Sequence, residues 1–193
     1  MPRLIQFPNP IRLDKLTRIV RIRDVDVFVH WTVFLLAGIM IYFAMHRPWV
    51  TLAGGASWLA LILLHESGHM IAAQKKGCGV TAIYLYPIHG LCCFSPPWSR
   101  FDHCVIAWGG VIAQLIVAVP LLLLVAIFGY SRFEPLNAVL AILGGYSLVM
   151  AVFNLLPIGR MDGTIAWGII PEFISRAKRR RKKKSASAGW RSY

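Results

Sequence analysis

The amino-acid sequence predicts a polytopic α-helical membrane protein with about four transmembrane helices and a small membrane-associated β-sheet or hairpin on the cytoplasmic side. Hydrophobic residues make up 57% of the chain and charged residues only 15%, and the apolar residues are gathered into long blocks. A helix needs about 20 apolar residues to cross a hydrocarbon core of about 30 Å. Blocks close to that length predict spans at about residues 28–45, 50–73, 104–130 and 136–158.

The positive charge is distributed unevenly between the predicted loops. Of the 21 Lys and Arg residues, 19 lie before the first span, between the second and third spans, or after the fourth, and 2 lie in the remaining loops. Because short cytoplasmic loops are enriched in Lys and Arg, both termini are predicted to be cytoplasmic. The charge pattern therefore predicts a multi-pass protein of the cell (cytoplasmic) membrane, and no nucleic-acid partner is expected.

The chain divides into an arm, a core and a tail. Residues 1–26 are predicted to form a cytoplasmic N-terminal arm, in which no signal-peptide cleavage site follows an apolar core. Near-alternation of apolar and polar residues over 17–29 predicts one strand that leads into the first span. Residues 27–170 are predicted to form the core, and residues 171–193 a basic cytoplasmic tail.

The tail and the segment before it carry two further predictions. Residues 165–174 are expected to form a short segment at the membrane interface. The polybasic run over residues 176–184 could bind anionic lipid, or it could act only as a topology anchor.

The loop between the second and third spans is the least helix-like stretch of the core. Residues 80–86 are rich in β-branched and aromatic side chains, Pro87 and Gly90 indicate a turn, and residues 91–94 could return as a partner strand. The pattern predicts a hairpin against the membrane surface, to which the strand at 17–29 could be added. Its exposed edge could accept an extended substrate as a further strand, or the hairpin could be a simple connection.

The pentapeptide His65-Glu66-Ser67-Gly68-His69 lies in the second span. Histidines four residues apart on a helix point in one direction and can bind one metal ion. The intervening Glu66 can accept a proton from a metal-bound water, as the general base of a metalloprotease does. Such groups are costly at hydrocarbon depth unless they are ligated, paired or face a polar cavity. A catalytic zinc site is therefore favoured over a structural His–Glu cluster.

A catalytic zinc site normally has three protein ligands and one water. Asp162 is the only acid between Glu134 and Glu172, and it follows the cytoplasmic end of the fourth span. Pro157 breaks the helix before it, so the chain could turn Asp162 back toward the metal, and Asn154 could hold the irregular backbone. Spacing alone leaves open whether Asp162 is the third ligand or a cap for the segment that follows.

Taken together, the two motifs resemble the signatures of the site-2 protease family of intramembrane zinc metalloproteases. The first is His65-Glu66-x-x-His69, and the second is Asn154-x-x-Pro157-x-x-x-x-Asp162-Gly163. The resemblance covers about residues 17–170. It includes a small-residue segment in the third span, Trp108-Gly109-Gly110-Val111, in which Val111 and Gln114 stand where the family usually has Pro and Asn.

The resemblance implies one zinc ion per chain and Glu66 as the catalytic base. The implied zinc ligands are His65, His69 and Asp162, and the implied supporting positions are Asn154, Pro157 and Gly163. It also implies a minimal member of the family, without a PDZ-like or nucleotide-sensing domain.

The implied activity is zinc-dependent hydrolysis of a peptide bond in or near a transmembrane segment of a substrate membrane protein, as in regulated intramembrane proteolysis. The alternative is a catalytically silent membrane protein that binds transmembrane helices without cleaving them, and the presence of Glu66 speaks against it. A prenyl-protein type of metalloprotease would be expected to supply a Glu as third ligand from a later helix. A metal transporter should line several spans with ionisable groups, whereas here only the second span carries them.

Overall fold

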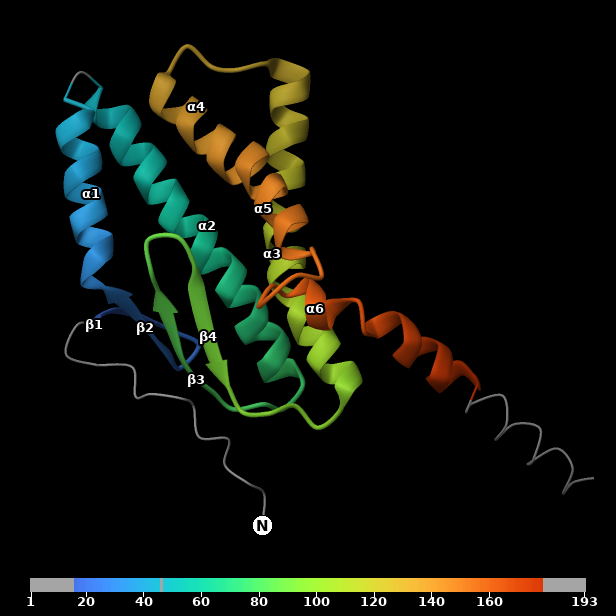
Figure 1. The fold of residues 1–193 in the computed structure, drawn as a ribbon. Coiled ribbons are helices and arrows are strands. Elements are labelled where there is room, and N and C mark those ends of the chain that lie inside the picture. The colour runs from blue at the N-terminus through green and yellow to red at the C-terminus, as the bar shows by residue number, and fades with distance from the viewer. Residues whose placement is uncertain (1–15, 46, 179–193) are drawn as a thin grey trace, which may run out of the picture.

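The computed structural model describes residues 16–45 and 47–178, and it combines a four-stranded sheet with a bundle of long helices (Figure 1). In chain order the elements are β1 (Leu16–Ile22), β2 (Val25–His30), α1 (Trp31–Phe43), α2 (Pro48–Lys75), β3 (Val80–Leu85), β4 (Gly90–Phe94), α3 (Arg100–Phe128), α4 (Glu134–Leu140), the π-helix η2 (Ala141–Tyr146), α5 (Ser147–Asn154) and α6 (Gly163–Ala166).

Three helical stretches within the described residues are long and apolar enough to cross a membrane. They are α2, α3 and the continuous stretch α4–η2–α5, and they correspond to the second, third and fourth predicted spans. The fold is thus mostly helical, as predicted.

The first predicted span is shorter in the structure than in the sequence pattern. Helix α1 has 13 residues and is about 20 Å long. The prediction of a span over residues 28–45 placed its start too early, because β2 continues to His30. The His30 side chain accepts a hydrogen bond from the Thr32 N–H and so marks the start of the helix. The structure therefore does not confirm the count of four spans.

The single strand predicted over residues 17–29 is wrong. The segment forms two antiparallel strands, β1 and β2, joined by a tight turn at Arg23 and Asp24. Both turn residues have positive φ angles, 47° and 65°, as type I′ hairpin turns require. Asn or Asp followed by Gly is usual in such a turn, and Arg at its first position is not. The sequence therefore carries no turn signal here, and its near-alternation resembles one continuous strand.

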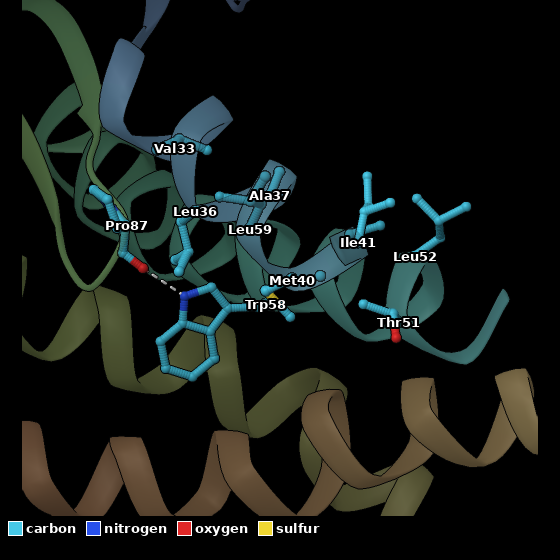
Figure 2. Close-up of a pocket in the computed structure, with 12 residues that line it drawn as sticks. Val33, Leu36, Ala37, Met40, Ile41, Thr51, Leu52, Trp58, Leu59 and Pro87 are labelled. Atoms are coloured by element: carbon cyan, nitrogen blue, oxygen red, sulfur yellow. Dashed lines mark hydrogen bonds between the residues drawn. The ribbon is translucent and has the colours of Figure 1, made fainter. Parts of the chain in front are cut away.

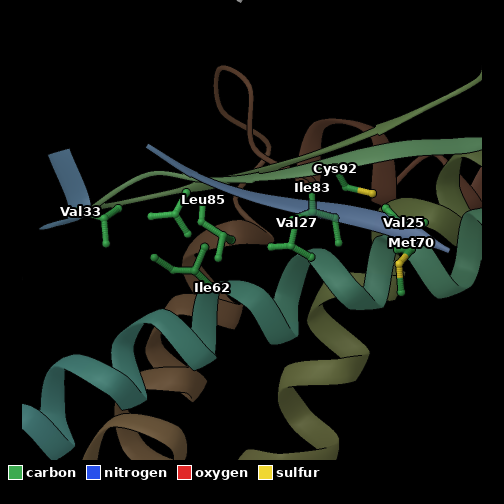
Figure 3. Close-up of a cluster of buried hydrophobic side chains, with 9 residues drawn as sticks. Val25, Val27, Val33, Ile62, Met70, Ile83, Leu85 and Cys92 are labelled. Atoms are coloured by element: carbon green, nitrogen blue, oxygen red, sulfur yellow. The ribbon is translucent and has the colours of Figure 1, made fainter. Parts of the chain in front are cut away.

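The sheet has the strand order β1-β2-β3-β4, in which β2 and β3 are parallel. The predicted hairpin of β3 and β4 is confirmed, and the N-terminal strands join it as expected. Alternate residues of β2 point toward helix α2, where Val25 and Val27 pack in one cluster with Ile62 and Met70 (Figure 3). Full burial of such side chains contributes about 1.5–3 kcal/mol each. This packing holds the sheet against the helix that carries the His-Glu-x-x-His motif.

The turn between β3 and β4 is also attached to α2. The indole N–H of Trp58 donates a hydrogen bond to the Pro87 carbonyl at 2.7 Å (Figure 2). A cavity of about 250 Å³ lies beside this contact, between α1 and α2, and aliphatic side chains form most of its wall.

Candidate active site

Helix α2 and the turn after α5 bring the three predicted metal ligands to one point. His65 and His69 are one helical turn apart, and their Nε2 atoms are separated by 3.0 Å. The Oδ2 atom of Asp162 lies 3.1 Å from His65 Nε2 and 3.2 Å from His69 Nε2. Both histidines are buried, and Asp162 is half-buried. The three residues form a group that could hold one metal ion.

The geometry and chemistry of the group fit zinc. Tetrahedral ligands about 2.0–2.1 Å from one zinc ion lie roughly 3.3 Å from one another, close to the spacing of these three atoms. The Nδ1–H of His69 donates to the Ile106 carbonyl at 2.8 Å, and the Nδ1–H of His65 donates to Gln114 Oε1 at 3.1 Å. With these protons on Nδ1, the lone pairs of both Nε2 atoms and of the carboxylate converge. A cation between them, such as zinc, would stabilise that arrangement.

Asp162 reaches the histidines because the chain turns sharply after α5. The helix ends at Asn154, Pro157 has no N–H with which to continue it, and Gly159 adopts a positive φ of 59°. Asp162 flanks the N-terminus of α6, but its side chain makes no capping hydrogen bond. Its carboxylate contacts the two histidines instead, so the geometry favours the ligand interpretation over the cap.

The supporting positions have different surroundings. Gly163 lies so close to the end of α5 that a Cβ atom there would collide with the Leu155 carbonyl. Asn154 lines the cavity around the site, and its side chain makes no hydrogen bond within the described part of the chain. Its predicted role in holding the backbone remains a prediction.

Two tryptophans that the sequence analysis did not assign to the site hold this turn. The Trp167 indole N–H donates to the Leu155 carbonyl at 2.7 Å, and the Trp108 indole N–H donates to the Ala166 carbonyl at 3.0 Å. An indole N–H in an apolar environment usually finds an acceptor, although Trp167 itself is 43% exposed. From the sequence, this rule predicts that each indole N–H has an acceptor, but it does not predict which residue supplies that acceptor.

Glu66 is buried beside the ligands, in a cavity of about 840 Å³ bordered by α2, β4 and the turn. The Cys92 backbone N–H of β4 donates toward its carboxylate. A Cβ atom on Gly90 would collide with the Glu66 side chain. The sheet thus closes one side of Glu66 and leaves its carboxylate inside the cavity with the metal ligands.

The cysteines are not part of the ligand group. Cys78, Cys92 and Cys104 are buried and Cys93 is half-buried, and none forms a disulfide. Burial, with smaller contributions from Glu66 and Cys93, raises the pKa of Cys92 to about 12. Its thiol is therefore neutral at physiological pH, and Cys92 packs in the hydrophobic cluster between the sheet and α2.

The small-residue segment lies where α3 crosses α2. A Cβ atom on Gly109 would stand 2.6 Å from the Gly68 carbonyl oxygen, and a Cβ atom on Gly68 would collide with Gly109. Helices approach this closely in membranes when neither carries a side chain at the crossing. The crossing brings Gly110 against the rings of His65 and His69.

Gly110→Ala should therefore disrupt the ligand group. The new methyl carbon would lie 2.6 Å from His69 Nε2 and from His65 Cε1, so the rings or the helix must shift. We expect a loss of zinc and a destabilisation of about 1–3 kcal/mol, measured as zinc per chain and as thermal unfolding in detergent. Gly38→Ala in α1 is the control, because no atom lies within 4 Å of its added carbon. Full zinc content in Gly110→Ala would contradict the geometry described.

Gln114 is the residue whose role was missed. It is 1% exposed and accepts the Nδ1–H of His65 across 49 residues of sequence. A single amide in an otherwise apolar span was the signal, because such a group is costly without a partner.

Gln114→Leu should weaken zinc binding by about 10–100-fold, the usual cost of losing a hydrogen bond that orients a metal-bound histidine. The measurement is zinc affinity by competition with a coloured chelator. Gln114→Glu retains an acceptor oxygen and should bind zinc more tightly than Gln114→Leu. Equal affinities for wild type and Gln114→Leu would show that the hydrogen bond does not support the site.

Comparisons with known proteins agree with these features. No family model matches the chain. The chain is 29% identical over 139 residues to a Synechocystis protein named "Putative zinc metalloprotease", and the match covers 61% of this chain and 35% of that protein. The chain therefore spans about a third of the length of this curated relative.

Among solved structures, the site-2 protease from Methanocaldococcus jannaschii superposes with a TM-score of 0.58 and 23% identity, over 83% of this chain and 72% of that one. The superposition thus covers most of this chain. The resemblance to the site-2 protease family, first indicated by the two motifs, is thus confirmed, and the chain has the fold of that family.

Proposed function

We propose that the chain is a zinc-dependent intramembrane endopeptidase that hydrolyses a peptide bond in or near a transmembrane segment of a substrate membrane protein. One observation carries the proposal. The Nε2 atoms of His65 and His69 and the carboxylate of Asp162 converge within 3.2 Å of one another, beside the buried Glu66 and on a helix of membrane-spanning length.

The residues of the chain have complementary roles in this reaction. When bound, zinc would supply a Lewis acid that lowers the pKa of a water molecule and polarises the scissile carbonyl. Glu66 accepts the proton of the attacking water and transfers it to the leaving amide nitrogen. Ile106 and Gln114 hold the two imidazoles with their Nε2 atoms toward the metal position. The side chains of His65, Glu66 and His69 are buried within the fold.

Substrate is proposed to enter the cavity along β4. This strand is an edge of the sheet, and Gly90, Leu91 and Cys92 line the cavity beside Glu66. An extended segment could pair with such an edge through main-chain hydrogen bonds. A transmembrane helix would have to unwind locally first, because its backbone groups are already hydrogen-bonded within the helix.

The proposed location is the cytoplasmic membrane, with four passes and both termini on the cytoplasmic side. Helix α1 leads from the sheet to the start of α2 and runs antiparallel to it (Figure 1). Arg47, before α2, forms an ion pair with Glu134, the first residue of α4, at 2.8 Å. These two turns therefore lie together at the end of the bundle away from the sheet. Among the described residues, Arg18, Arg21 and Lys76 lie at the sheet end, which the positive-inside rule assigns to the cytoplasm.

The proposal is tested with the purified chain in liposomes that also contain a pool of single-span membrane proteins. We expect fragments cut in or near a span, identified by mass spectrometry. Chelation with 1,10-phenanthroline should abolish them, and added zinc should restore them. If the zinc-loaded, folded protein retained members of the pool without cutting any, the helix-binding alternative would replace the protease.

A further inference from the structure

The chain continues beyond α6 as a second helix over residues 169–178, at the end of the described part of the sequence. Three large apolar side chains of this helix are half or more exposed: Ile170 at 52%, Phe173 at 67% and Ile174 at 50%. Their spacing of three and four residues places them on one face of the helix. No described residue covers this apolar face.

The opposite face is attached to the start of α3. The Arg176 guanidinium lies 4.0 Å from the centre of the Phe101 ring, and its Nη2 donates to Ser99 Oγ at 3.4 Å. Glu172 and Ser175 on this side are half-buried. The helix is therefore held at the end of a candidate span, and it leaves the bundle sideways instead of following the long helices (Figure 1).

The positive charge next to the apolar face indicates that this face binds an anionic surface. Residues 176–184 contain eight Lys and Arg and no acidic residue. A helix with an apolar face and an adjacent cluster of basic residues binds in the plane of an anionic membrane surface. A second protein could also cover an apolar face, but the basic run and the position at the end of a span are complementary to lipid.

We propose that residues 169–178 form an interfacial helix that inserts Ile170, Phe173 and Ile174 into the acyl region of an anionic leaflet, and that the positive charge of the sequence over residues 176–184 strengthens this binding. The helix starts seven residues after Asp162. The lipid surface thus holds the far end of the segment that carries the third candidate ligand. The proposal does not depend on proteolysis, because the position of the helix is measurable without a substrate.

The test is the depth of a nitroxide label on Phe173→Cys in the full chain. The protein is reconstituted in phosphatidylcholine vesicles and in vesicles with 30% phosphatidylglycerol, and collisions with oxygen and with a water-soluble nickel chelate are compared by power saturation. Wild type supplies the background, because its four cysteines are buried or half-buried. We expect the label in the anionic vesicles to collide with oxygen and to be shielded from nickel.

A charge variant is the matched control for this experiment. With Lys178 and the basic residues at 179–184 replaced by Gln, the label should become more accessible to nickel in the anionic vesicles. The same label at Ile170→Cys gives a second measurement if one position disturbs the helix. Nickel-accessible labels in both lipids would overturn the proposal. Shielding that is equal in both lipids and persists in detergent would also overturn it, because it would show a protein partner on this face.

Discussion

Replacing Glu66 with Gln should abolish peptide hydrolysis while leaving about one zinc per chain in place. Gln has the size and shape of Glu, so the crowded contact with Gly90 should be retained. It cannot accept the proton of the attacking water, and loss of a general base costs about 10²–10⁴-fold in rate. The rate is measured by single-turnover cleavage of a substrate identified in the liposome experiment, with zinc determined on the same samples.

Glu134→Gln is the matched control for this substitution. Glu134 lies at the opposite end of the bundle in an exposed ion pair with Arg47, and such pairs contribute only about 0–1 kcal/mol. The control should cleave at the wild-type rate. Cleavage by Glu66→Gln at that rate would remove Glu66 from the mechanism, whereas loss of its zinc would mean that the substitution had disturbed the ligands.

Replacing Asp162 with Ala should remove most of the zinc. The substitution leaves two histidines, whereas catalytic zinc sites normally use three protein ligands. Loss of a residue that only orients a metal ligand weakens metal binding by about 10–100-fold. Loss of Asp162, a direct ligand, should weaken zinc binding by at least that factor. Zinc per chain, after equal dialysis of wild type and variant in mild detergent, measures the effect without any knowledge of the substrate.

The control for this prediction is Asp24→Ala. Asp24 lies in the exposed turn between β1 and β2, where it pairs with Arg21, and its side chain is 95% exposed. This variant should keep the zinc content of wild type. Circular dichroism should show that Asp162→Ala remains helical. If folded Asp162→Ala retained all its zinc, the third ligand would be another residue and the assignment of Asp162 would be withdrawn.

Local patterns in the sequence determined much of this protein. Hydropathy indicated the second, third and fourth spans, because the cost of placing a residue in hydrocarbon is nearly additive along a helix. The spacing of His65 and His69 predicted that they share a helix face, because helical geometry requires it. Pro87 and Gly90 indicated the hairpin through their own backbone preferences.

Only the tertiary structure decided how distant segments meet. His65 and Gln114 are 49 positions apart in sequence, and Trp108 and Ala166 are 58 apart, so no local pattern encodes their hydrogen bonds. The choice between ligand and cap for Asp162 depended on where the turn after α5 lies relative to α2. The length of α1 depended on how far β2 pairs with its neighbours. Such contacts arise from the packing of whole elements, and the side chains that make them are otherwise compatible with many folds.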